Sequence, residues 1–178
     1  IYFFGFNAFK LILISIISSV VFEAIIQKAF KKEVTVNDLS AVVTGILLAF
    51  NLPATAPWWL PVIGSAFAVI VVKQLFGGLG ENFMNPALAA RAMSNFIAPG
   101  AVDGATSATP LSIMKYGVSD AAASATVAEA GNTLPALKEM FLGNIGGCIG
   151  ETSALLLLIG AAYLLIRGVI NWRIPFTY

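Results

Sequence analysis

A long apolar segment near the start of the chain, residues 6 to about 29, limits the available folds more than any other feature. Its centre, Leu11 to Ile17, reads LILISII, and three lysines close it at Lys28, Lys31 and Lys32. About 20 helical residues, each rising 1.5 Å, cross a hydrocarbon layer of about 30 Å. We therefore predict a membrane-spanning helix over this segment.

The composition of the whole chain points to the same class of protein. Of its 178 residues, 58% are hydrophobic and 11% are charged, whereas a soluble domain carries about 25% charged residues. We predict an integral membrane protein and expect no nucleic-acid partner. The chain has one cysteine and no histidine, which excludes an internal disulfide framework, a multi-thiolate iron–sulfur site within this chain and any histidine-based catalysis.

Four more apolar segments follow the first. The second ends in two prolines and two tryptophans between Pro53 and Trp59, which is typical of a helix that breaks near the membrane interface. Asn85 and Pro86 predict the N-cap and first turn of the fourth segment. This segment is short for a full crossing, so the sequence leaves open whether it crosses the membrane or re-enters on the same side. We predict one all-α transmembrane domain over residues 1–178, a multi-span helical bundle with short or broken helices. Its further spans are expected at residues 39–52, 60–73, 85–98 and 140–166, with a loop at 99–138.

The basic residues predict how these spans are oriented. Lysine and arginine concentrate on the cytoplasmic side of membrane proteins, and Lys73, Arg167 and Arg173 join the lysines after the first span there. The loop at 99–138 then lies on the outer face of a multi-pass protein. The chain starts at Ile1 without a basic segment or cleavage site, so we expect no signal peptide and interpret the chain as a piece of a longer protein.

The predicted outer loop contains a run of small and hydroxyl residues, DGATSATPL, which starts at Asp103. It resembles the flavin-attachment motif Asp-Gly-x-Ser/Thr-Gly-Ala-Thr, in which the phosphate of FMN esterifies the last threonine. The motif has an aspartate six residues before that threonine. Asp103 has this spacing to Thr109, whereas Gly100 has it to Thr106. The resemblance therefore implies covalent FMN on Thr109, with Ser107 where the motif usually has glycine.

A second motif, GENFMNPALAAR, ends at Arg91 and resembles the signature Gly-x-Asn-Phe-x-Asn-Pro-Ala-Leu-x-Ala-Arg. The helix that starts at Pro86 presents free backbone N–H groups to an anion. We expect Arg91 to bind the flavin phosphate or a flavin carbonyl, because an idle arginine in an apolar helix is costly. Asn82 and Asn85 either bind the edge of the flavin ring or simply cap the helix.

Two acidic residues, Glu23 and Glu151, lie within predicted spans. Carboxylates inside a membrane are candidate cation or proton sites, and the hydroxyl residues that follow Glu151 favour it over Glu23. The alternative is a structural hydrogen bond between helices or to a partner subunit. We expect Cys148 to be a small packing residue.

These motifs occur in one order along the chain, together with LLAFNLP from Leu47 to Pro53 and GETS from Gly150 to Ser153. The chain thus resembles the RnfD and NqrB family, whose members belong to the Rnf ion-translocating complex and to its sister, the sodium-pumping NADH:quinone reductase. The resemblance implies a prokaryotic cell (inner) membrane protein that receives electrons from a neighbouring FMN-bearing subunit. It also implies coupling of ferredoxin–NAD electron transfer to Na⁺ or H⁺ translocation, and it allows a second, non-covalent riboflavin.

A cofactor-free secondary transporter is the alternative function. Such proteins use broken helices, intramembrane acids and paired halves, and the interrupted segments around Asn51 and Gly143 fit that description. The hydroxyl-rich loop favours the flavin protein. The sequence does not distinguish Na⁺ from H⁺ as the translocated ion.

Overall fold

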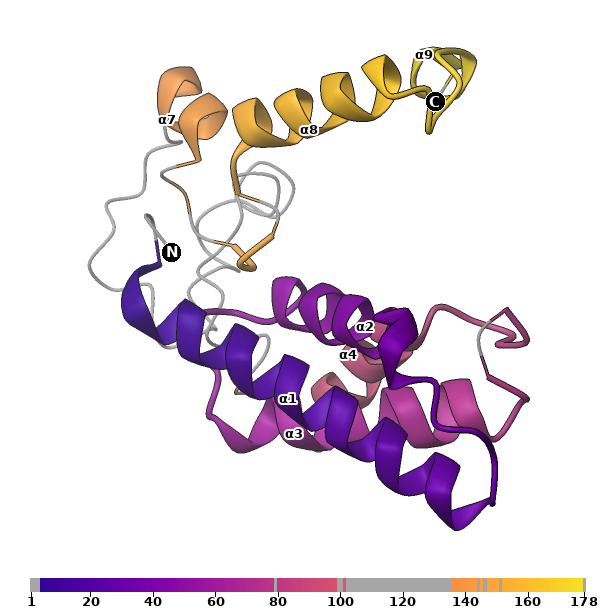
Figure 1. Ribbon diagram of the computed structural model, residues 1–178. Helices are drawn as coiled ribbons and strands as arrows, with labels where there is room; N and C mark the ends of the chain where they lie inside the picture. Colours follow the sequence, from indigo (N-terminus) through magenta and orange to yellow (C-terminus); the bar gives the residue numbers. More distant parts are fainter. Residues whose placement is uncertain are drawn as a thin grey trace.

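The computed structural model describes residues 4–78, 80–98, 101, 136–143, 145, 147–150 and 152–177. Within these residues the regular structure is entirely helical, in agreement with the predicted all-α class. Helices α1 to α4 pack together, whereas α7, α8 and α9 lie apart from them (Figure 1).

Helix α1 (Gly5–Ala29) coincides with the predicted first span and is about 37 Å long at 1.5 Å per residue. Among the described helices, only α1 is long and apolar enough to cross a membrane. Its exposed side includes Leu13, Ile17, Val21 and Ile25. Apart from Leu11, its buried face carries small or polar residues, and the whole set is spaced by three or four: Ala8, Leu11, Ser15, Ser19, Glu23 and Gln27. A helix that hides polar groups and exposes apolar ones suits apolar surroundings.

Helix α2 (Ser40–Phe50) follows the short 3₁₀ helix η1 (Val36–Asp38) and crosses α1 in close contact. A Cβ on Gly45 would lie 2.8 Å from Ile16 Cα and 2.8 Å from Ser15 O, so this crossing requires glycine. The Ser15 hydroxyl donates a hydrogen bond to the Gly45 carbonyl at 2.8 Å.

Helix α3 (Trp59–Ala66) continues directly into η2 (Phe67–Gln74), an eight-residue π-helix. Helix α4 (Pro86–Ile97) closes the bundle and buries Ala87, Ala90 and Ser94. These small side chains let α4 pack closely on its neighbours. The apolar core combines residues of all four helices and the α2–α3 connection, namely Leu11, Leu48, Leu52, Ala56, Leu60, Ala68, Ala87 and Ala90.

The segment predicted as the last span, residues 140–166, is divided between two helices. The chain forms α7 (Leu137–Leu142) and α8 (Ala154–Ile166), followed by α9 (Arg173–Thr177). Gly143 ends α7 at φ +100°, where a Cβ would lie 2.7 Å from Ser153 Cβ. That left-handed backbone favours glycine and cannot continue a helix.

Several helices are shorter than a membrane crossing. Helices α2, α4 and α8 have 11, 12 and 13 residues, against the roughly 20 that a span requires. The number of crossings therefore stays a prediction.

Candidate functional site

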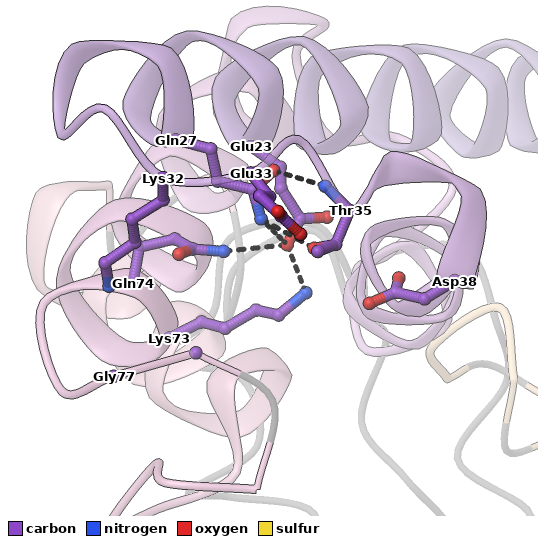
Figure 2. Close-up of a pocket in the computed structure, with 10 residues that line it drawn as sticks. Glu23, Gln27, Lys32, Glu33, Thr35, Asp38, Lys73, Gln74 and Gly77 are labelled. Atoms are coloured by element: carbon purple, nitrogen blue, oxygen red, sulfur yellow. Dashed lines mark hydrogen bonds and ion pairs between the residues drawn. The ribbon is translucent and has the colours of Figure 1, made fainter.

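A buried ion pair lies towards the C-terminal end of α1. Glu23 of α1 is fully buried, and Lys73 of η2 is 2% exposed. The Lys73 Nζ donates to Glu23 Oε1 at 2.5 Å, and the neighbouring Gln74 Nε2 donates to the same oxygen at 2.8 Å. Figure 2 shows both side chains reaching up from η2 to the Glu23 carboxylate. The acid predicted as a cation or proton site is thus held by a lysine.

The same lysine also contacts the start of α2. Its Nζ donates to Ser40 Oγ at 2.5 Å, and Ser40 Oγ donates to Asp38 Oδ1 at 2.5 Å. The Ser40 backbone N–H donates to that oxygen as well, at 2.8 Å. The Lys73 ammonium is therefore bound directly to Glu23 and is connected to Asp38 through the Ser40 hydroxyl.

The pKa of the Asp38 carboxyl lies below its usual value. The hydrogen bond from the Ser40 hydroxyl is the main cause, and the Ser40 N–H and the positive charge of Lys73 act in the same direction. Slight burial opposes them. Asp38 is therefore a stable anion beside the buried pair.

One oxygen of Glu23 lacks a hydrogen bond. Within the described part of the chain, no donor reaches Glu23 Oε2 or Ser19 Oγ, one turn earlier on the same face of α1. An unsatisfied buried carboxylate oxygen is costly. A cavity of about 300 Å³ lies beside it, lined by Glu23, Gln27, Lys32, Glu33, Thr35, Asp38, Lys73, Gln74, Gly77 and Gly78. This cluster has the groups and the space to bind a small cation.

The local sequence explains why these side chains meet. The spacing of four between Ser15, Ser19, Glu23 and Gln27 places them on one face of α1. Lys73 and Gln74 are consecutive, yet both are buried. An α-helix separates consecutive side chains by about 100°, and the wider turn of η2 brings these two to the same acid. Such π-helical turns are rare and occur frequently at functional sites.

Arg91 lies at a second junction, between α4, the end of α2 and the glycine-rich segment that runs from Gly143 to Gly150. Its Nη1 donates to the Asn51 carbonyl and to Cys148 Sγ, the latter at 3.2 Å. Cys148 is 6% exposed. These contacts satisfy a carbonyl at the negative end of a helix. The predicted binding of flavin by Arg91 stays a prediction.

The two interrupted segments meet at this junction. The N–H groups of Ile149 and Gly150 donate to the carbonyls of Leu52 and Phe50 at 3.1 and 3.0 Å. A Cβ on Gly150 would lie 2.6 Å from Phe50 Cβ, so this approach requires glycine. The breaks around Asn51 and Gly143, noted in the sequence, are therefore joined by backbone hydrogen bonds.

The remaining predicted residues make local hydrogen bonds or lie outside the described residues. Asn85 caps α4, accepting from the N–H groups of Ala87 and Leu88 at 2.9 and 3.3 Å. Asn82 donates to the Met84 carbonyl at 3.2 Å. The residues predicted for the flavin loop, Asp103, Ser107 and Thr109, lie outside the described part of the chain. The same holds for Glu151, the other predicted acidic site. The fit of FMN to its loop thus stays a prediction.

The partners of Glu23 were not among the predicted site residues. Lys73 was predicted only as a cytoplasmic positive charge, and Gln27, Ser40 and Gln74 were assigned no role. The polar residues spaced by four along an otherwise apolar helix were the available signal, because a buried acid among them requires a cationic partner.

Comparisons with known proteins show which sequences the chain is similar to. The model of the NQR2, RnfD, RnfE family matches residues 1–178. The chain is 52% identical, over 99% of its length, to 55% of the D subunit of the Na⁺-translocating ferredoxin:NAD⁺ oxidoreductase complex of Acetobacterium woodii. It is 39% identical, over 97% of its length, to 54% of the proton-translocating counterpart of Clostridium ljungdahlii. It is also 42% identical, over 74% of its length, to 33% of the B subunit of the Na⁺-translocating NADH-quinone reductase of Klebsiella pneumoniae.

Proposed function

Because the chain belongs to the NQR2, RnfD, RnfE family, we propose that it is part of a membrane electron-transfer subunit that carries covalent FMN. The subunit acts in a complex that couples electron transfer between ferredoxin and NAD to the translocation of Na⁺ or H⁺. The identity of 52% over 99% of the chain to a component of an Na⁺-translocating oxidoreductase complex carries this proposal. Nearly the whole chain matches each of these curated relatives, but it spans only about half of the relative's length.

Thr109 is the proposed attachment residue for FMN, and its spacing from Asp103 supports the choice. When bound, FMN supplies one- and two-electron redox chemistry, while the protein positions it and sets the surrounding charge. Arg91 is proposed to stabilise negative charge on the flavin. A non-covalent riboflavin and a neighbouring FMN-bearing subunit complete the proposed electron path.

Glu151 and Glu23 are the proposed cation- or proton-binding carboxylates of this chain. The burial of Glu23 beside a cavity supports its part in this proposal. A carboxylate away from water must be neutralised by a proton, a bound cation or a basic side chain. The binding of a proton or cation to such a carboxylate therefore responds to the charge of an electron that arrives on a nearby flavin.

Fluorescence of the full-length subunit in a denaturing gel tests the flavin proposal. The subunit is produced together with the flavin transferase and separated in SDS. We expect a fluorescent band from the wild type and from Thr106→Val, and none from Thr109→Val. A non-fluorescent wild-type band contradicts the proposal.

A cofactor-free secondary transporter remains the second candidate, and one observation favours it. The broken segments meet through the backbone hydrogen bonds of Ile149 and Gly150, as expected for paired discontinuous segments around a transport site. A transporter of this kind moves its ion without a flavin, so the same gel separates the two functions.

A further inference from the structure

We propose that Lys73 is a tethered cation with two positions, which neutralises Glu23 until Na⁺ binds there and then moves towards Asp38. The inference rests on the proposed function, because it assumes that the complex translocates a cation. The new element is that Lys73 competes with Na⁺ for Glu23 and so controls when Glu23 can bind the ion. Na⁺ is chosen over H⁺ because the relative at 52% identity is named Na⁺-translocating.

The position of the ammonium group is the first observation. Lys73 Nζ lies 2.5 Å from both Glu23 Oε1 and Ser40 Oγ. Ser40 Oγ in turn lies 2.5 Å from Asp38 Oδ1. The flexible four-carbon stem of lysine lets its charge move over a few ångströms. A short shift past Ser40 exchanges the buried carboxylate for the exposed one.

A free ligand group for the incoming ion is the second observation. Glu23 is fully buried, and its Oε2 has no hydrogen-bond partner among the described residues. Ser19 Oγ, one turn away on the same face, is in the same condition. Carboxylate and hydroxyl oxygens are hard ligands and suit a hard cation. Both oxygens can turn to an ion without giving up a hydrogen bond in this part of the protein.

The cavity supplies the space for the exchange. Glu23, Lys73 and Asp38 all line the same volume of about 300 Å³, and Figure 2 shows Asp38 beyond the Lys73 ammonium, on the side away from Gln74. A water molecule takes up about 30 Å³ in the liquid. The cavity therefore accommodates an ion with some of its hydration water as well as a displaced lysine head group.

Charge balance links the two movements. A buried carboxylate left without a cation costs several kcal/mol, so Lys73 leaves Glu23 only when another cation replaces it. After the exchange, Na⁺ neutralises Glu23 and Lys73 pairs with Asp38. Return of Lys73 to Glu23 expels the ion, which gives the site a built-in means of release.

Two substitutions in the assembled complex test the inference through shifts of opposite sign. The measured quantity is the Na⁺ concentration that gives half-maximal ferredoxin:NAD⁺ electron transfer in proteoliposomes. Lys73→Met removes the competitor and is expected to lower that concentration by about tenfold, equivalent to about 1.4 kcal/mol. Asp38→Asn removes the second position but keeps an acceptor for Ser40. It is expected to raise the concentration by about two- to fivefold, as for a partly exposed ion pair worth about 0.5–1 kcal/mol.

Lys28→Met is the matched control, because Lys28 is exposed and lies outside the residues that line the cavity. It removes the same charge from the end of α1 and is expected to leave the Na⁺ dependence unchanged. If Lys73→Met does not assemble, Asp38→Asn decides the question alone.

Shifts of the same sign in both variants, or no shift in Asp38→Asn, overturn the inference and leave Lys73 as a structural partner of Glu23. A wild-type complex that carries covalent flavin and transfers electrons independently of Na⁺ also overturns it, while the proposed function stands. A wild-type subunit without covalent flavin instead contradicts the proposed function.

Discussion

Arg91 connects three segments that are distant in the sequence. It projects from α4 to the Asn51 carbonyl at the end of α2 and to Cys148 in the glycine-rich segment. The sequence indicated that this arginine is paired, because an unpaired charge in an apolar helix is costly. Its protein partners could not be predicted, since a backbone carbonyl leaves no mark in the sequence.

Replacing Arg91 by leucine should destabilise the subunit. A lost hydrogen bond from a charged group costs about 1.5–3 kcal/mol, and the expected result is a lower thermal unfolding temperature in detergent. Arg91→Lys keeps the charge but not the planar donor geometry and is the control. Its unfolding temperature should lie between those of the wild type and Arg91→Leu. An unfolding temperature equal to the wild type would contradict the structural role.

The same Arg91→Leu variant tests the proposed contact with the flavin. Loss of about 1.5–3 kcal/mol of stabilisation of the reduced, anionic form lowers a one-electron potential by roughly 65–130 mV, at 59 mV for each tenfold change. Redox titration of fully flavinylated protein measures it. A potential equal to that of the wild type at full occupancy would restrict Arg91 to its contacts within the protein.

At the scale of the helices, the α1–α2 crossing depends on Gly45. Its added Cβ would meet backbone atoms of α1 at 2.8 Å, and backbone cannot move aside as a side chain can. Gly45→Ala should therefore cost about 1–3 kcal/mol, as overpacking does in other cores. Gly160→Ala in α8, where nothing lies within 4 Å of the added Cβ, should instead gain about 0.5–1 kcal/mol. Thermal unfolding of both variants checks the contrast, and equal effects would contradict it.

The stability of the protein should depend on pH through Asp38, which lies where η1 meets α2. Its pKa in the folded protein is lower than the ordinary 3.8, so the ionised carboxylate stabilises the folded state. That contribution is complete above the unfolded pKa and disappears as the pH falls through the folded pKa. Asp38→Asn should be less stable than the wild type near pH 6, and the difference should vanish in strong acid. A stability difference that does not change with pH would contradict this origin.

The helices differ in how far the sequence could predict them. Helix α4 was predictable because Asn85 and Pro86 carry an explicit start signal, and both act as expected. In the segment at 140–166 the glycines indicated an interruption around Gly143, but hydropathy does not register the backbone angle that ends α7 there, so the bounds of α7 and α8 could not be predicted. The π-helical geometry of η2, which brings Lys73 and Gln74 to Glu23, has no comparable signal in the sequence.

At the scale of the whole molecule, much of the surface is apolar. Helix α8 has no buried residue, and the outer face of α1 is lined by large apolar side chains. Such surfaces need apolar surroundings, either lipid or other protein. The composition predicted this, but it could not predict which face of each helix turns inward, because α1 buries four polar residues and leaves many of its large apolar ones exposed.

The proposed coupling of electron transfer to ion translocation is a property of the whole complex, and Glu151 is the residue of this chain through which we test it. Glu151→Gln keeps the shape and hydrogen bonding of the side chain but removes its charge, so electron transfer should continue in part while ion uptake into vesicles falls. Glu81→Gln, at an exposed position, is the control and should retain both activities. Wild-type electron transfer and ion uptake in Glu151→Gln would assign the ion path to another residue or subunit.

The covalent flavin is the central claim, and peptide mass spectrometry of the full-length subunit tests it most directly. Trypsin cleaves after Arg91 and Lys115, so a single peptide contains both Thr106 and Thr109. Fragment ions that break the chain between these two threonines show which one carries the added mass. We predict FMN on Thr109. An unmodified peptide, or FMN on Thr106, would contradict the assignment.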